Sequence, residues 1–557
     1  MWRAVGAVAV AAGLALVVYP SAVLVGSSFV SGGRLSLALY AEPARDPRAL
    51  LDLWHSVAVS VAATAGGTLL GVALAALTGR TDLPARRLWE TLLLVPYMIP
   101  PFIGAIAWVY LLGPVGYLNR AWMALAGASG PLLVVYGPAG IVAVMILYGY
   151  PIVYLAVSGA LERMDPSLEE AARIARAGPW QVFRDVTVPL IRPAALAGAL
   201  LLCMSCLGDF GIPVILGEPA RYFVLTTRIY SMVLNADQPD HLRAAAALSM
   251  WLVGLAAILI TLQRRMHARS RATTVGGPVA ARSRVALGPW RLPALAGVAA
   301  WVLVTSILPL GAIVLTSLLR AYGVPPAPAN LTLAHYATAL GGVPKVPRAV
   351  LNSLGLAAGS ATIVVVLGVA IGYRLARLAP WAAAAFDLLI SVPYAVPGTV
   401  VALAMILAWL RPIPVVGLRL YDTIWILLVA YVARFLVFGV RTVQAGLAQV
   451  HGSLEEAARI SGAGPLEAFL GIMVPIIRPS LAAGWALAFV PAVAELTLSI
   501  LLFSVGNETI GVVIFGLHDE GKITLAAALA VLVSLLLVAL NVLVRALLGG
   551  RAEASHG

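Results

Sequence analysis

Three ionisable side chains interrupt long apolar stretches of this 557-residue chain, and such charges could do electrostatic work inside a membrane. Asp209 and Glu495 stand inside two apolar runs at positions 286 residues apart (495 − 209 = 286), and Arg434 stands midway along a third run. Because a charged side chain inside a bilayer costs free energy, such residues usually pair with one another or serve a function. Two interpretations stay open: a buried ion pair between Arg434 and Glu495, or groups that line a translocation path or its outer gate. We expect each acid about 25 Å along its membrane helix.

Other patterns that could carry chemistry are weaker. Residues 516–522 have the glycine and lysine spacing of a phosphate-binding loop, but Ile523 replaces the hydroxyl residue that would hold magnesium and Asp519 would repel phosphate. Cys203 and Cys206 form a C-x-x-C with no further Cys or His close in sequence, which indicates packing. We therefore predict no catalytic residue, no metal site and no cofactor in this chain, and a membrane enzyme is the remoter alternative.

The composition indicates the class of protein. Hydrophobic residues make up 61% of the chain and charged residues 11%, with apolar runs long enough to cross a bilayer throughout. We expect a polytopic all-α membrane protein with about twelve spans, six in each half, on the length criterion. The predicted spans cover residues 2–29, 54–78, 89–113, 136–160, 191–216, 243–262, 292–318, 352–373, 382–410, 422–446, 479–504 and 523–548.

The chain is internally duplicated. The eight residues from Ser167 to Ile174 return unchanged from Ser453 to Ile460, at the offset that also separates the two acids (453 − 167 = 286). These are polar segments in a very apolar chain, so composition alone does not explain the match. We call residues 161–190 the first island and residues 447–476 the second island.

Other marks repeat at an offset of 297 (393 − 96 = 297). The proline pairs Pro96/Pro100 and Pro393/Pro397 predict kinked helices. Gly71 and Gly368 repeat at the same offset (368 − 71 = 297), and the pairs Gly67/Gly71 and Gly368/Gly372 each have the small-residue spacing of closely packed membrane helices.

Each island predicts a short helix and a sharp corner. Ser167 and Ser453 are good N-cap residues, and the glutamate three residues later completes a capping box. Gly178 and Gly464 are expected to supply a left-handed stop, and the proline that follows each of them forbids continuation of the helix.

The islands resemble the EAA loop of ABC importer permeases. Both carry Glu-Ala-Ala, a glycine several residues on and an apolar residue before proline. In that family the loop is the coupling helix that docks into a cleft on a cytoplasmic ATPase. The resemblance assigns ATPase coupling to Glu169, Glu170, Ala171, Ala172, Gly178, Pro189, Glu455, Glu456, Ala457, Ala458, Gly464 and Pro475. The structural alternative is that Glu170 and Glu456 only cap their own helices.

Three strings narrow the resemblance to ferric-iron-type permeases: residues 209–213, 222–230 and 495–498. The fold implied is two parallel six-helix type I importer domains fused in one chain. The first domain is expected at 1–262, an arginine-rich linker at 263–289 and the second domain at 290–557. The resemblance implies import by alternating access, and relatives that carry thiamine, phosphonate or polyamine remain alternatives.

Arginine placement predicts the orientation. The stretch 263–291 holds seven arginines and no acid, and the islands are also arginine-rich. The positive-inside rule then places both termini, the linker and both islands on the cytoplasmic side of the membrane. We expect a multi-pass protein of the bacterial cell (inner) membrane.

The implied partners follow from that placement. They are a homodimer of a nucleotide-binding ATPase, which would bind ATP and magnesium, a periplasmic or extracellular substrate-binding protein, and membrane lipid, with no nucleic acid. The rival class is an ion-coupled secondary transporter, because those also carry twelve helices in two repeats.

Overall fold

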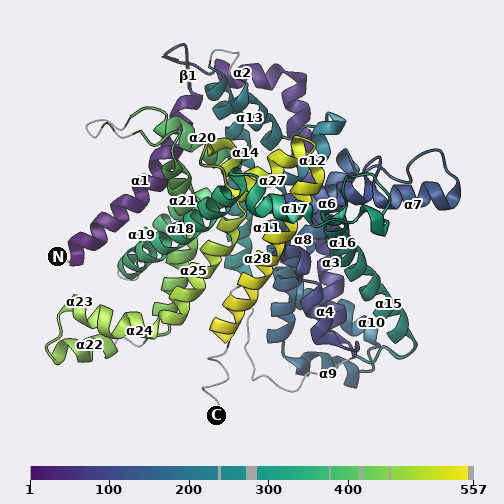
Figure 1. Cartoon of the computed structure of the whole chain (residues 1–557). Helices are drawn as coiled ribbons and strands as arrows, with labels where there is room; N and C mark the ends of the chain where they lie inside the picture. Colours follow the sequence, from purple (N-terminus) through teal and green to yellow (C-terminus); the bar gives the residue numbers. More distant parts are fainter. Residues whose placement is uncertain are drawn as a thin grey trace. The chain divides into compact units, whose positions relative to one another are not determined.

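The computed structural model describes residues 2–235, 240–270, 285–375, 378–412, 417, 419–450 and 453–549, and these residues are overwhelmingly helical (Figure 1). Within them, ten helices are long and apolar enough to cross a membrane, or up to twelve if each of two sharply bent pairs forms one span. The all-α class and the number of spans expected from the sequence are thus confirmed. The described strands, β1 (Val30–Ser31) and β2 (Arg34–Leu35), pair as a small antiparallel hairpin.

The chain forms two compact units. Unit 1 comprises residues 1–45, 229–251 and 332–557, and unit 2 comprises residues 46–228 and 252–331. The units therefore exchange the first helix of each sequence half. Helix α1 (Trp2–Ser28) packs with the second-half helices of unit 1, whereas α15 (Arg291–Val302) and α16 (Leu308–Leu318) belong to unit 2. The sequence-domain boundary at 263–289 remains a prediction.

The centre of unit 2 is a packed trio of α3 (Pro47–Arg80), α8 (Pro138–Arg163) and α11 (Val188–Gly208). Gly71 of α3 lies directly against α8. A Cβ added there would lie 2.8 Å from Val153 Cβ and 2.9 Å from the Tyr150 carbonyl oxygen. The glycine spacing thus serves close helix packing, as predicted.

Unit 1 contains the matching trio of α18 (Lys345–Leu375), α21 (Ile424–Leu447) and α25 (Arg478–Val493). Gly368 of α18 meets Gly439 of α21, and a Cβ added at Gly368 would lie 2.5 Å from the Gly439 carbonyl carbon. The sequence duplication is therefore also a duplication of the helix core.

The proline pairs interrupt their helices. Helix α5 (Val95–Met98) ends before Pro100, and α6 (Pro101–Leu112) follows. Helices α19 (Pro380–Ala395) and α20 (Gly398–Trp409) are bent by 103° at the break around Pro397. The predicted interruptions are confirmed at Pro100 and Pro397, whereas Pro393 lies inside α19 without ending it. Proline interrupts a helix because it lacks an N–H and clashes with the preceding turn.

The remaining elements are shorter or connect these. In unit 2 they are α4 (Arg86–Leu92), α7 (Tyr117–Ala126), α9 (Pro166–Ile174), α10 (Pro179–Val182), η1 (Phe183–Thr187), α12 (Gly211–Gly217), η2 (Glu218–Ala220), η3 (Gly288–Trp290), η4 (Leu303–Ile307) and η5 (Pro328–Asn330). In unit 1 they are α2 (Ala38–Arg45), α17 (Ala334–Ala337), η6 (Thr338–Gly342), α22 (Ser453–Ile460), α23 (Pro465–Ala468), η7 (Phe469–Met473), α24 (Val474–Ile476), α26 (Ser499–Leu502), α27 (Ile510–Asp519) and α28 (Ile523–Gly549). Helices α13 (Leu225–Leu234) and α14 (His241–Ser270) each contain residues of both units.

Candidate functional site

The first island begins its helix two residues earlier than predicted. Asp165, not Ser167, is the N-cap of α9, and its Oδ1 accepts a hydrogen bond from the Ser167 N–H at 2.9 Å. Pro166 takes the first helical position, which suits a residue with no N–H and a fixed φ. The Ser167 N–H lowers the pKa of the Asp165 carboxyl below its usual value. The residues before Ser453 lie outside the described part of the chain, so its cap role stays a prediction.

Both island helices end in the same way. The Ala177 N–H donates to the Ala172 carbonyl and the Ala463 N–H donates to the Ala458 carbonyl, each at 3.0 Å. This six-residue bond is characteristic of a helix terminated by a left-handed residue. That residue is at position 176 in the first island (φ 63°) and at Gly462 in the second (φ 92°).

The left-handed role predicted for Gly178 and Gly464 is therefore wrong. Gly178 has an extended backbone with φ −69°, and Gly464 is not among the described left-handed residues. Each glycine N–H instead bonds to the side chain three residues on, Gln181 at 2.9 Å and Glu467 at 3.4 Å. An added Cβ would meet only Gln181 Oε1 at 3.9 Å in the first corner and nothing within 4 Å in the second. The packing of this chain does not require glycine at either corner.

The islands expose apolar side chains at matching positions. Ile174 is 84% exposed and Ile460 is 88% exposed, and they are equivalent in the duplication (460 − 174 = 286). Leu168 and Leu454, also equivalent, are 47% and 43% exposed. These residues are not among the predicted site residues, although apolar residues present in both copies of a polar segment were the available signal. Exposed apolar groups of this kind mark interaction surfaces when they gather on one element.

The adjacent glutamates of the first island differ in environment. Glu170 is exposed, whereas Glu169 is only 2% exposed. Glu169 Oε1 accepts a hydrogen bond from Thr187 Oγ1 at 2.8 Å and lies 3.6 Å from Arg80 Nε, and its Oε2 lies 3.5 Å from Arg173 Nη2. The side chains of Glu455 and Glu456 lie outside what the structure describes.

The second island is attached to its unit by apolar contacts. Phe469 packs against Tyr373 with a ring-centroid distance of 4.5 Å, and Met473 joins the same buried cluster. Met473 is the repeat equivalent of Thr187 (473 − 187 = 286). At this position the first island thus has a hydrogen-bonding side chain and the second has an apolar one.

The predicted acids lie at helix breaks rather than inside continuous helices, which corrects the sequence-based expectation. Asp209 follows the end of α11 with an extended ψ of 134°, and its Oδ1 accepts from the Ile212 N–H at 3.1 Å. Glu495 lies between α25 and α26, and its Oε2 accepts from the Leu498 N–H at 2.9 Å. Each carboxylate therefore satisfies backbone N–H groups where its span is interrupted.

Arg434 lies in α21 beside another helix break. Its Nη1 is buried without a hydrogen-bond partner among the described residues, and its guanidinium carbon lies 6.0 Å from the Tyr394 ring centroid. A Cβ on Gly398, at the start of α20, would lie 3.2 Å from Nη1. No ion pair within 4.0 Å joins Arg434 to Glu495 among the described residues, and Arg434 Nη1 has no hydrogen-bond partner there. The alternative of a direct ion pair is not supported.

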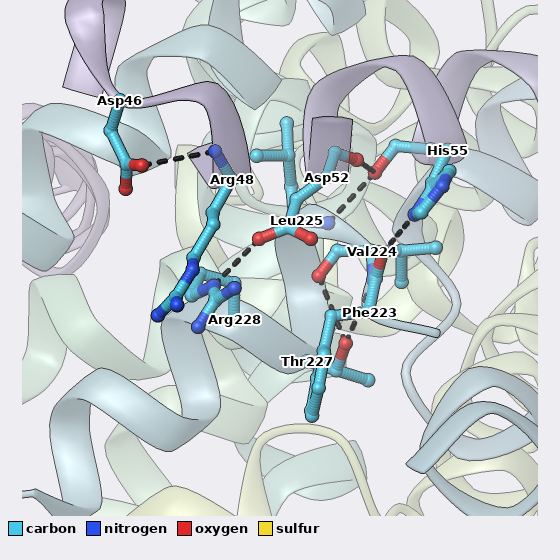
Figure 2. A network of polar contacts seen from close by, with 10 residues as sticks. Asp46, Arg48, Asp52, His55, Phe223, Val224, Leu225, Thr227 and Arg228 are labelled. Atoms are coloured by element: carbon cyan, nitrogen blue, oxygen red, sulfur yellow. Dashed lines mark hydrogen bonds and ion pairs between the residues drawn. The ribbon is translucent and has the colours of Figure 1, made fainter. Parts of the chain in front are cut away.

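A polar network that sequence analysis missed ties the start of α3 to the start of α13 within unit 2 (Figure 2). Asp52 is 3% exposed and its Oδ2 lies 2.6 Å from Arg228 Nε. Ser56 Oγ accepts from the Leu225 N–H at 2.7 Å, and His55 Nδ1 lies 2.9 Å from the Phe223 carbonyl oxygen. The only signals were an acid near the start of a span and the arginine within residues 222–230.

Unit 1 repeats the neutral part of this network. Ser353 Oγ accepts from the Ile510 N–H at 2.8 Å, and Asn352 Nδ2 donates to the Glu508 carbonyl at 3.0 Å. Position 353 is the equivalent of position 56 (353 − 56 = 297), whereas Ala349 stands where the first repeat has Asp52 (349 − 52 = 297). Both repeats therefore share the serine hydrogen bond to the backbone, and the first repeat adds the ion pair between Asp52 and Arg228.

Comparison with known proteins agrees with the duplication. The sequence profile of the family described as "Binding-protein-dependent transport system inner membrane component" matches twice, at residues 67–271 and 365–550. The probable ABC transporter permease protein y4fN of Sinorhizobium fredii is 27% identical over 493 residues, covering 86% of this chain and 84% of that protein. The putative ferric transport system permease protein FbpB 1 of Haemophilus influenzae is 28% identical, covering 79% of this chain and 68% of that protein.

A third relative is also a permease subunit, and one solved structure shows partial similarity. The ferric transport system permease protein FbpB of Actinobacillus pleuropneumoniae is 27% identical, covering 83% of this chain and 66% of that protein. A bacterial ABC transporter involved in the import of alginate is similar with a TM-score of 0.37 and 17% identity, covering 46% of this chain and 96% of that one. The family profile covers well over half of this chain, in two copies. The chain belongs to the family of inner membrane components of binding-protein-dependent transport systems, and it is an ABC transporter permease with two fused transmembrane domains.

Proposed function

We propose that this chain couples ATP hydrolysis by a separate subunit to the uptake of a substrate, with ferric iron as the cargo. The observation that carries this proposal is the pair of equivalent isoleucines, Ile174 and Ile460, each more than four-fifths exposed on a short helix between candidate spans. An isoleucine exposed at the equivalent position of both repeats indicates a surface that a partner covers. Two such helices suit a two-fold ATPase homodimer.

The island corners support the same role. Glycine is not needed at Gly178 or Gly464 for backbone conformation or internal packing, because both backbones are outside the left-handed region and both positions have room for a Cβ. Small size at these corners therefore serves close approach by something outside the chain. The coupling assignments of Glu170, Ala171, Ala172 and Ala457 belong to the same proposed surface, whereas Ala458 is buried.

The transport cycle proposed here is alternating access. A substrate-binding protein delivers cargo at the outer face, closure of the ATPase dimer draws the islands together, and hydrolysis resets the permease. Both termini lie in the cytoplasm and the chain lies in the bacterial inner membrane. Asp209, Glu495 and Arg434 line the path or its gate, because the two acids lie where helices are interrupted and Arg434 lies beside such a break, as in transporters whose sites are built from broken helices. The relatives named for ferric transport favour iron, and thiamine, phosphonate and polyamine are the competing cargoes.

The test combines Gly178→Asp with Gly464→Asp in the full chain, expressed with its ATPase and binding protein. We expect the ATPase to co-purify less and uptake of radiolabelled ferric iron to be lost, because a carboxylate now fills each docking corner. Gly341→Asp is the matched control, since that exposed glycine also has no atom within 4 Å of an added Cβ. Unchanged uptake in the double variant, or uptake driven by an ion gradient without nucleotide, would refute ATP coupling through the islands.

A further inference from the structure

The first island contains a buried charge that a docking surface does not need. Glu169 neighbours the exposed Glu170, yet its side chain points into unit 2, where it is 3% exposed and is surrounded by Arg80, Arg173 and Thr187. A carboxylate buried in this way is retained only with charged or hydrogen-bonding partners. It therefore cannot be the glutamate that meets an ATPase residue.

The partners of Glu169 belong to three different elements. Arg80 is the last residue of α3, Thr187 ends η1 and leads directly into α11, and Arg173 lies one turn further along α9. Arg80 also donates from Nη2 to the carbonyl oxygen of Leu161 in the last turn of α8, at 3.2 Å. The ends of α3, α8 and α11, the packed trio of unit 2, therefore meet at one carboxylate and one guanidinium.

We infer that Glu169 and Arg80 form an internal strut that transmits movement of α9 to the helices of unit 2, with Glu169 as a positioning residue rather than a docking residue. This inference rests on the proposed function, because it assumes that a partner moves α9. The physical reason is stiffness. Glu169 joins α9 to the end of η1 through Thr187 at 2.8 Å and to the end of α3 through Arg80 at 3.6 Å, and Arg80 is in turn bonded to the end of α8, whereas the rest of α9 is largely exposed.

One contact of the strut, the hydrogen bond from Thr187, has no counterpart in the second repeat. Met473 stands where Thr187 stands in the first island, and the second island is held by the apolar cluster of Tyr373, Phe469 and Met473. A methionine cannot donate the hydrogen bond that Thr187 gives to Glu169. The charges themselves recur in the sequence, because Arg377 and Glu455 stand at the positions equivalent to Arg80 and Glu169 (377 − 80 = 297, 455 − 169 = 286), but their side chains lie outside what the structure describes. The difference between the repeats that the described residues show is the loss of the threonine hydrogen bond.

The experiment compares Glu169→Gln with Glu170→Gln in the full chain, reconstituted with ATPase and binding protein in proteoliposomes. Glutamine keeps the size of the buried side chain and can still accept from Thr187, so the fold should survive. For Glu169→Gln we expect the ATPase to co-purify as with the wild type, while the amount of ferric iron moved per ATP hydrolysed falls about tenfold, a typical loss for one coupling contact. For Glu170→Gln we expect weaker co-purification instead.

Rescue separates positioning from simple structural support. The exchange Glu169→Arg with Arg80→Glu restores the opposite charges and should recover part of the transport-to-hydrolysis ratio that either single change removes. Thermal unfolding of each variant reports the structural contribution separately. If Glu169→Gln keeps the wild-type ratio, or if it loses ATPase co-purification as Glu170→Gln does, the strut is wrong. If the wild-type chain itself binds no ATPase, the proposed function fails instead.

Discussion

At the scale of single residues, each island uses different residues for its left-handed helix stop and for its corner before proline, whereas the sequence predicts one glycine for both. Gly178 and Gly464 precede proline and are the strongest turn signals in their segments, yet the left-handed backbone lies two residues earlier, at Arg176 and Gly462. Arginine does not favour that conformation, so the first island alone gives no sign of it. Only the glycine at the equivalent position of the second island (462 − 176 = 286) could have identified the true helix stop.

This difference predicts opposite effects of two substitutions on stability. Arg176→Gly should stabilise the protein by about 1 kcal/mol, because it removes the cost of a left-handed conformation for a residue with a Cβ. Gly462→Ala should destabilise it by about the same amount. Thermal unfolding of the detergent-solubilised chain measures both. Gly464→Ala is the control and should change nothing, because that backbone is not left-handed and its surroundings are open; equal damage from the two alanines would contradict the assignment.

At the scale of elements, most of the fold could be predicted because apolar length and proline are local signals. The spans, the kink at Pro397 and the glycine contacts between α18 and α21 follow from them. The breaks at Asp209 and Glu495 could not, because apolar sequence continues past both acids and length alone predicts an unbroken span. What interrupts the helix is a carboxylate that bonds to backbone N–H groups three residues ahead, and hydropathy does not register that bond.

The broken elements lead to a prediction about the path residues. Asp209→Asn and Glu495→Gln keep an oxygen that can accept the same backbone hydrogen bonds, so both variants should fold and bind the ATPase. If these groups serve the path, uptake falls by about tenfold or more while ATP hydrolysis continues, since charge along a path is what the substitutions remove. Arg434→Gln should behave alike.

A matched control for these variants comes from the same helix as Arg434. Arg441 of α21 is exposed and bonds to Asp387 at 3.1 Å, so Arg441→Gln should leave uptake near the wild-type rate. Loss of folding in the Asp209, Glu495 and Arg434 variants, shown by aggregation in size-exclusion chromatography, would assign these residues to structural support and not to the path.

At the scale of the whole molecule, the compact units are not the two sequence halves. Helix α1 packs in unit 1, where Tyr19 donates to the Ala408 carbonyl oxygen at 3.3 Å and its ring lies 5.2 Å from the ring of Trp409. The sequence does not predict this exchange, because an apolar helix pattern specifies that a face is buried but not which helix buries it. Because both repeats are fused in one chain, α1, α15 and α16 are covalently linked to the units in which they pack.

The exchange predicts how the chain behaves when it is cut. Residues 1–270 and 285–557, co-expressed as separate polypeptides with a tag on the first, should co-purify after detergent extraction. Unit 1 needs residues 1–45 and 229–251 from the first piece, and unit 2 needs α15 and α16 from the second. Either piece alone lacks part of both units and should aggregate. A second piece that begins at residue 332 omits α15 and α16, so it should still bind the first piece through α1 but give a complex with a lower unfolding temperature. Two halves that each purify alone as soluble, folded species would show that the helices are not exchanged, since each half would then bury its own first helix.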